Sequence, residues 1–128
     1  MNAMIAANAP RTERPWGWFE TLGEAPGYRV KRLLIRAGRR ISLQRHQHRG
    51  EHWVVVSGRG ILELAERRIE TLPGGTLFIP TGAKHRASAC GADDLVIIEV
   101  QRGDVLREDD IERYEDDYGR VIRSMNSL

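Results

Sequence analysis

The sequence is poor in three features that would otherwise define its class: cysteine, long apolar runs and an export signal. The single cysteine, Cys90, cannot form an internal disulfide, which is typical of proteins from the reducing cytoplasm. The longest apolar runs, such as residues 53–56, are far too short to cross a bilayer. Residues 1–9 lack the basic start and long apolar run of a signal peptide. We therefore expect a cytoplasmic protein with no membrane partner.

Acidic residues are missing from one long stretch of the chain. Residues 29–49 carry eight basic side chains and no acidic one, whereas residues 104–117 carry eight acidic and two basic ones. The basic stretch suits an anionic small substrate such as a phosphate ester, although a solvated surface explains most of these arginines as well. A basic helix, an aromatic stacking motif and zinc-finger spacing are all absent from the sequence, so we expect no nucleic-acid partner.

Length and composition fit one globular domain. The 128 residues are 41% hydrophobic and 30% charged, which is typical of a chain with a real core. Short segments rich in β-branched residues alternate with Pro/Gly turns, and this pattern predicts an all-β barrel of two antiparallel sheets. Only residues 108–118 have helical spacing. We expect residues 1–13 to form a flexible tail and residues 14–128 to form the domain.

The stretch from residue 38 to residue 58 concentrates the chemistry of the chain. Gln44, His46 and His48 alternate on one face of a predicted strand, and Glu51 begins the next strand. Imidazole nitrogens, an amide oxygen and a carboxylate from two adjacent strands are suitable ligands for a borderline divalent cation. His52 has the opposite parity to Glu51, so we expect it to form hydrogen bonds on the outer face.

Two spaced motifs carry a resemblance to a known family. The series Gly38, Gln44, His46, Glu51 and Gly58, with five, one, four and six intervening residues, resembles the first cupin motif, with glutamine in place of its first histidine. The series Gly74, Pro80, Gly82 and His85, with five, one and two intervening residues, resembles the second, although Ala89 replaces its final asparagine. The resemblance implies a cupin fold, a double-stranded β-helix of two antiparallel sheets.

Longer segments narrow the resemblance. RPWGWFETL, VKRLLI, ISLQRHQHRGEHWVVVSG, FIPTGAKHR, IIEVQRG and EDDIERYEDDYGR resemble the type II mannose-6-phosphate isomerase domain over residues 14–120. That domain usually follows a guanylyltransferase domain in bifunctional enzymes. No glycine-rich nucleotide loop fits before residue 14, so we expect a free-standing cupin without guanylyltransferase activity.

The resemblance implies a metal site formed by Gln44, His46, Glu51 and His85. These donors suit Zn²⁺ best, with Mn²⁺, Co²⁺, Fe²⁺ or Ni²⁺ as alternatives. His48 competes with Gln44 for one position, because both share the parity of His46. The spacing from His46 to Glu51 matches the cupin pattern only if His46 is the second ligand, which favours Gln44 as the first.

The resemblance also implies a reaction, the metal-dependent interconversion of mannose 6-phosphate and fructose 6-phosphate through an enediolate. We expect Glu99, which has the parity of a buried strand, to move the proton, although it could instead pair with a buried arginine. His48 and Lys84 are further catalytic candidates. The candidates for holding the substrate are Lys31, Arg32, Arg113 and Arg120.

Two other function classes remain open at this level. One is a non-catalytic cupin that binds a sugar phosphate or a sugar nucleotide. The other is a different metal-dependent cupin enzyme, such as an oxygenase, which would favour iron and an apolar pocket. We also expect a homodimer, because small cupins commonly pair sheet to sheet.

Overall fold

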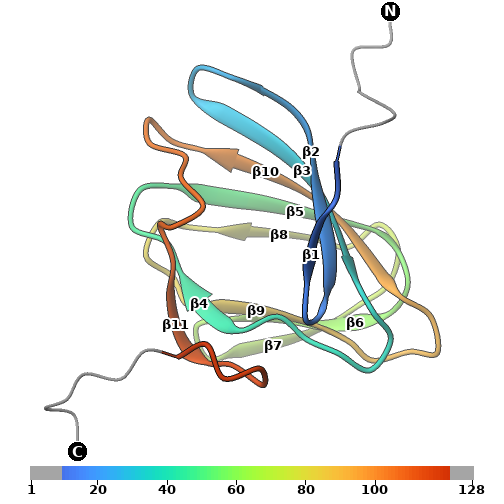
Figure 1. Ribbon diagram of the computed structural model, residues 1–128. Coiled ribbons are helices and arrows are strands. Elements are labelled where there is room, and N and C mark those ends of the chain that lie inside the picture. Colours follow the sequence, from blue (N-terminus) through green and yellow to red (C-terminus); the bar gives the residue numbers. More distant parts are fainter. Residues whose placement is uncertain (1–9, 122–128) are drawn as a thin grey trace, which may run out of the picture.

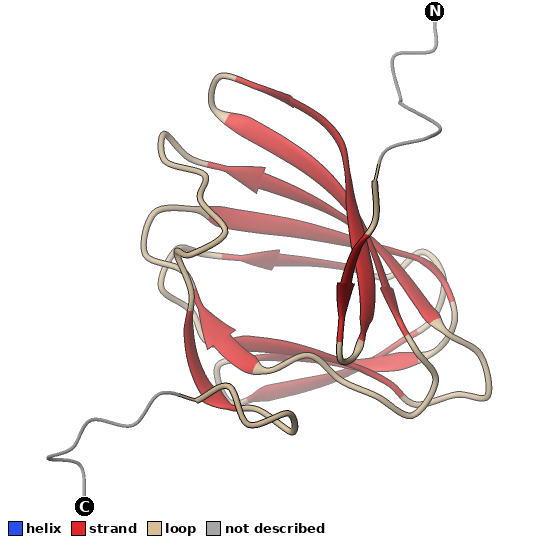
Figure 2. Cartoon of the chain, in the orientation of Figure 1, coloured by secondary structure: helices blue, strands red, loops and turns tan. Residues whose placement is uncertain are grey.

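The computed structural model describes residues 10–121. In that range all regular structure is β-strand, and no helix that could span a membrane is found there (Figure 2). The strands are β1 (Thr12–Arg14), β2 (Gly17–Ala25), β3 (Tyr28–Ile35), β4 (Leu43–Arg45), β5 (Gly50–Ser57), β6 (Gly60–Leu64), β7 (Arg67–Thr71), β8 (Thr76–Ile79), β9 (His85–Ala89), β10 (Leu95–Arg102) and β11 (Glu112–Glu115).

These strands form two antiparallel sheets that face each other (Figure 1). The larger sheet has the order β1-β2-β3-β10-β5-β8, and the smaller has the order β11-β4-β9-β6-β7. Neighbours such as β3 and β10 are far apart in sequence, so most pairings cross from one part of the chain to another. The predicted all-β barrel of two antiparallel sheets is confirmed.

Alternation along each strand separates the core from the outer face. In β5, Trp53 and Val55 are each 1% exposed, whereas Val54 and Val56 are 42% and 50% exposed. His52 also lies on the outer face, where its ring stacks on Phe78 with centroids 4.7 Å apart. The outward orientation expected for His52 is therefore confirmed, although within residues 10–121 its ring contacts Phe78 rather than forming the expected hydrogen bonds. The homodimer stays a prediction.

The inner face of the larger sheet is apolar at one end and polar at the other. Antiparallel register places Ile97 beside Leu33 and Val55, deep in the core. Two residues further along β10, Glu99 lies between Lys31 and Trp53. Because side chains of cross-strand partners point to the same face, these polar groups enter the barrel together.

The helix expected over residues 108–118 does not form. Residues 112–115 are instead strand β11, which pairs with β4 and places Arg113 opposite Gln44. An isolated helix of this length is marginal in water, whereas pairing with the edge of a sheet satisfies its backbone groups. The helical spacing still marks partly buried positions, since Tyr118 packs against the core and Ile111 lines a cavity between the sheets.

Two boundaries also differ from expectation. Thr12 and Glu13, assigned to the flexible tail, belong to β1 and pair with Phe19 and Trp18. Residues 1–9 of that tail lie outside the described residues. The strand expected to carry residues 44, 46 and 48 ends at Arg45, so its two-residue alternation does not continue to His48.

Candidate metal centre

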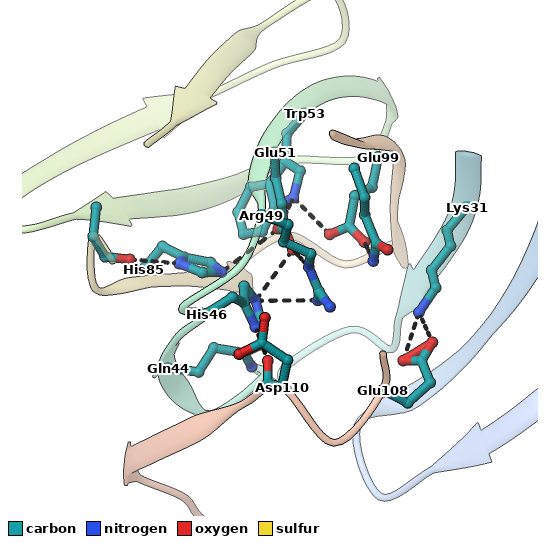
Figure 3. A network of polar contacts seen from close by, with 12 residues as sticks. Lys31, Gln44, His46, Arg49, Glu51, Trp53, His85, Glu99, Glu108 and Asp110 are labelled. Carbon is teal, nitrogen blue, oxygen red and sulfur yellow. Dashed lines mark hydrogen bonds and ion pairs between the residues drawn. The ribbon is translucent and has the colours of Figure 1, made fainter. Parts of the chain in front are cut away.

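Three side chains with metal-ligand atoms converge between the two sheets (Figure 3). Glu51 belongs to β5 of the larger sheet, His85 begins β9 of the smaller sheet, and His46 follows the end of β4. Their ligand atoms lie within 4.8 Å of one another. The three residues are 3% exposed or less, so the sheets hold them in place. We call this set the metal cluster.

Backbone carbonyl groups fix both imidazole rings. His46 Nδ1 lies 2.7 Å from the carbonyl oxygen of Asp110, and His85 Nδ1 lies 2.9 Å from that of Ala83. Each Nδ1 therefore donates its hydrogen to a carbonyl, and each Nε2 is directed at Glu51. The two Nε2 atoms lie 3.1 Å and 3.6 Å from the Glu51 carboxylate.

Charge and burial keep the metal cluster in the protonation state that binds a metal ion. Burial favours the neutral acid, but the contact with His46 and the nearby His85 imidazole and Arg49 guanidinium hold the pKa of Glu51 well below its usual range. Burial lowers the pKa of His85. At neutral pH the cluster therefore offers a carboxylate and an uncharged imidazole nitrogen.

This donor set fits a divalent cation. The buried His85 Nε2 has no hydrogen-bond partner among the described residues, although such atoms are normally satisfied. Two imidazole nitrogens and a carboxylate match the ligands of zinc and related metals. His46, Glu51 and His85 are thus brought together as predicted from the sequence, and their cluster could hold a metal ion.

Gln44 lies beside this cluster on the smaller sheet. It is the cross-strand partner of His85, so both side chains occupy one face of that sheet. Its amide nitrogen lies 2.9 Å from Ser42 Oγ, which leaves the amide oxygen available to coordinate a metal ion. Its role as the fourth ligand stays a prediction.

Sequence reasoning missed Arg49. Its side chain is buried, and its Nε donates to Glu51 Oε2 at 2.8 Å. Its guanidinium also lies 3.3 Å from His46 Nε2 (Figure 3). The signal that could have found it is its position between His46 and Glu51, two ligands of the first cupin motif.

A cavity lies next to the metal cluster, between the sheets. It is bordered by Gln44, Arg49 and Trp53, each of which adjoins a residue of the cluster. The charged residues that line it are Arg14, Lys31, Arg49, Glu99, Glu108, Arg113 and Arg120. We call it the central cavity. It brings together five of the predicted site residues, Lys31, Gln44, Glu99, Arg113 and Arg120, and adds Arg14, which the sequence did not suggest.

Glu99 is the carboxylate of this cavity that accepts its hydrogen bonds from uncharged groups. Its two oxygens accept from Trp53 Nε1 at 2.9 Å and from Gln101 Nε2 at 2.8 Å. Burial and the nearby charge of Glu51 raise the pKa of Glu99 to about 7. Lys31, the cross-strand neighbour of Glu99, is ion-paired with Glu108 instead (Figure 3). The alternative role of Glu99, pairing with a buried arginine, is therefore not what the structure shows.

Three other predicted site residues lie outside the cavity. Arg32 has the opposite parity to Lys31 and is ion-paired with Glu20. Lys84 is exposed, with its ammonium 3.9 Å from the centre of the Tyr114 ring. His48 is also exposed, because β4 ends before it, and its backbone N–H donates to Asp110.

The fold and this donor set define the molecule as a cupin. The capsular polysaccharide assembling protein CapF from Staphylococcus aureus matches it with a TM-score of 0.74 and 20% identity, over 86% of this chain and 32% of that one. An RmlC-like cupin from Shewanella frigidimarina matches with a TM-score of 0.69 and 16% identity, over 80% and 88% of the two chains. At such identities the likeness shows the fold alone.

Comparison of the amino-acid sequence also shows the family to which the chain belongs. The model of the family described as mannose-6-phosphate isomerase C-terminal matches residues 3–116, and the chain belongs to that family. The xanthan biosynthesis protein XanB of Xanthomonas campestris is 42% identical over 108 residues, which are 84% of this chain and 23% of that protein. The alginate biosynthesis protein AlgA of Pseudomonas aeruginosa is also 42% identical, over 84% of this chain and 22% of AlgA. The chain thus spans less than a quarter of these curated relatives.

Proposed function

We propose that this cupin is a metal-dependent aldose–ketose isomerase that interconverts mannose 6-phosphate and fructose 6-phosphate in the supply of polysaccharide precursors. The observation that carries the proposal is the metal cluster beside a cavity that combines a buried carboxylate with several guanidinium groups. Family membership supports it, as do the similar xanthan biosynthesis protein XanB and alginate biosynthesis protein AlgA. A cytoplasmic location remains part of the prediction.

In this proposal His46, Glu51 and His85 hold the cation, with Gln44 as the fourth ligand and Zn²⁺ as the metal. A bound divalent cation supplies electrostatic stabilisation for negative charge on the sugar oxygens.

Glu99 carries the proton between C1 and C2 of the sugar. Arg49 pairs with Glu51 and Lys31 pairs with Glu108, whereas Glu99 is hydrogen-bonded by uncharged donors. A carboxylate without an ion-pair partner is the more basic one and exchanges its proton more readily. Glu99 is therefore the proposed catalytic base and acid of the cavity.

A coupled assay of the metal-reconstituted protein with mannose 6-phosphate tests the function. We expect turnover with at least one of Zn²⁺, Mn²⁺ and Co²⁺, and a loss of roughly 10²–10⁴-fold in kcat for Glu99→Gln. Glu66→Gln makes the same change on the exposed β6–β7 turn and should leave kcat unaltered. Unchanged kcat in Glu99→Gln would contradict the assigned role.

A non-catalytic cupin that binds a sugar phosphate or sugar nucleotide is the second candidate function. One observation favours it: Arg49 already balances the charge of Glu51 in the metal cluster. Absence of turnover with all three metals, together with measurable binding of mannose 6-phosphate, would favour this second function.

A further inference from the structure

Three arginines line one side of the central cavity. Arg14 ends β1, Arg113 lies in β11, and Arg120 follows β11 in the C-terminal segment. We call them the arginine cluster. Like charges placed together repel one another unless opposite charges offset them. The arrangement therefore raises the question of which anions balance these guanidinium groups.

The ion pairs of the cavity leave two of these charges unmatched. Lys31 is paired with Glu108, and Arg49 with Glu51. Arg120 donates from Nε to Asp116 at 2.8 Å.

For Arg14 and Arg113, the described part of the chain provides no salt bridge. Arg14 NH1 donates to the carbonyl oxygen of Glu13 at 3.0 Å, and its guanidinium lies 5.2 Å from the centre of the Phe19 ring. Arg113 Nε is buried and lacks any hydrogen-bond partner among residues 10–121. Burial, followed by the charges of Arg120 and Arg14, lowers the pKa of Arg113, and the charge of Asp116 offsets this only in part. An anion bound by the cluster would offset the charges of Arg14 and Arg113 and would give Arg113 Nε a hydrogen-bond acceptor.

Strand register fixes where this cluster lies relative to the metal cluster. Arg113 is the partner of Gln44 across β11 and β4, and Gln44 is the partner of His85 across β4 and β9. The three side chains therefore form a row on one face of the smaller sheet, with backbones spaced about 4.8 Å apart. A ligand held by Arg113 can thus reach along Gln44 towards His85, about two strand spacings away.

We propose that Arg14, Arg113 and Arg120 bind the phosphate monoester of the substrate and direct its sugar towards the metal cluster. The sugar part of this statement rests on the proposed function, whereas the anion site stands on the arginines alone. Arg113 makes the central contact, because its Nε is the buried donor without a partner in the described structure. Asp116 positions Arg120, and the Phe19 ring positions Arg14.

Calorimetric titration of the full chain, with and without a saturating divalent cation, tests the anion site. Inorganic phosphate and mannose 6-phosphate should both bind, whereas mannose should bind at least tenfold more weakly than mannose 6-phosphate. Arg113→Gln should weaken both phosphate ligands about tenfold to hundredfold, because it removes charged hydrogen bonds. Arg113→Lys keeps the charge but loses the planar fork, so its loss should be smaller.

Arg14→Gln gives a second variant on another strand, and a loss of about tenfold is expected from it. Arg68→Gln removes the same charge from exposed β7, outside the cavity, and should bind like the unaltered chain. Equal affinities in Arg113→Gln and Arg68→Gln would overturn the site. So would active isomerase whose KM does not change in Arg113→Gln. Arginine-dependent phosphate binding in a chain that isomerises nothing would support the anion site and contradict only the proposed function.

Discussion

The metal cluster and the arginine cluster lie side by side in the barrel but are held in different ways. His46, Glu51 and His85 are almost fully buried, and both imidazole rings are fixed by backbone carbonyl groups. The arginine cluster comes from strands near the two ends of the described chain, and its side chains are only half-buried. The sheets thus preorganise one cluster, whereas segments that pack across the barrel provide the other.

This difference separates two tasks that an isomerase site must combine. Rigid ligands favour a defined ion geometry, because little reorganisation is needed on binding. Long arginine side chains on peripheral strands can adjust to an anion that enters from solvent, with ion pairs such as Arg120–Asp116 limiting their freedom. Substitutions in the metal cluster should therefore change metal content without changing phosphate affinity, and substitutions in the arginine cluster should do the reverse.

The largest expected effect is the loss of metal from variants of the cluster. His85→Ala and His46→Ala should each remove most of the bound metal, because each withdraws a nitrogen donor that no neighbour replaces. The metal content of the purified variants, measured by atomic emission, checks this. Phosphate affinity should change less than threefold in the same proteins.

His52→Ala is the matched control, since it removes an imidazole from the outer face of the larger sheet. Its metal content should equal that of the unaltered chain. The same loss from all three histidine variants would indicate general unfolding, and the distinction between the two clusters would then fail.

A smaller effect separates Gln44 from His48. Gln44 is the cross-strand partner of His85, whereas His48 is exposed beyond the end of β4. Gln44→Ala should therefore weaken metal binding about tenfold, and His48→Ala should leave it nearly unchanged. Competition with a chromogenic chelator measures both affinities. Greater loss from His48→Ala would reverse the assignment of the fourth ligand.

The metal cluster could be predicted from the sequence because its information is local. Spacing within residues 38–58 places His46 near Glu51, and a second short motif provides His85. The strand parity that placed Glu99 inside the barrel is equally local. The fold class followed from the same short strands and turns. The predicted inward orientation of His48 was wrong, because it extended the two-residue alternation past Arg45, where β4 ends.

Arg113 and Arg120 are among the substrate residues predicted from the sequence, but Arg14 and the meeting of the three arginines could not be predicted in this way. Arg14 and Arg113 meet only because β1 and β11 pack around one cavity, and no short-range pattern encodes that contact. Residues 108–118 also have helical spacing, and in a helix the Arg113 side chain would point in a different direction from the one it takes in β11. Pairing with β4 overrode that local preference, as tertiary contacts commonly do.

The smallest expected effect concerns the anchor of the arginine cluster and depends on pH. Burial alone would raise the pKa of Asp116, but hydrogen bonds from the side chain and backbone of Arg120 hold it below its ordinary value of 3.8. A carboxyl with a lowered pKa stabilises the fold above its unfolded value, and this contribution is lost as the pH falls through the folded value. Asp116→Asn should therefore lower the free energy of unfolding by about 1 kcal/mol at pH 7.

The difference between Asp116→Asn and the unaltered chain should stay constant from pH 7 to about pH 5 and begin to shrink near pH 3.8, where the carboxyl of the unfolded chain becomes protonated. It should disappear below the lower folded-state pKa, where the carboxyl is protonated in both states. Urea unfolding at a series of pH values measures it. Asp104→Asn, an exposed neighbour of β10, is the control and should show no difference at any pH. A gap for Asp116→Asn that persists unchanged to pH 2.5 would mean that the ion pair with Arg120 is not what stabilises this segment. Arg120 would then be as loosely held as Arg14, and the cluster would have no fixed member.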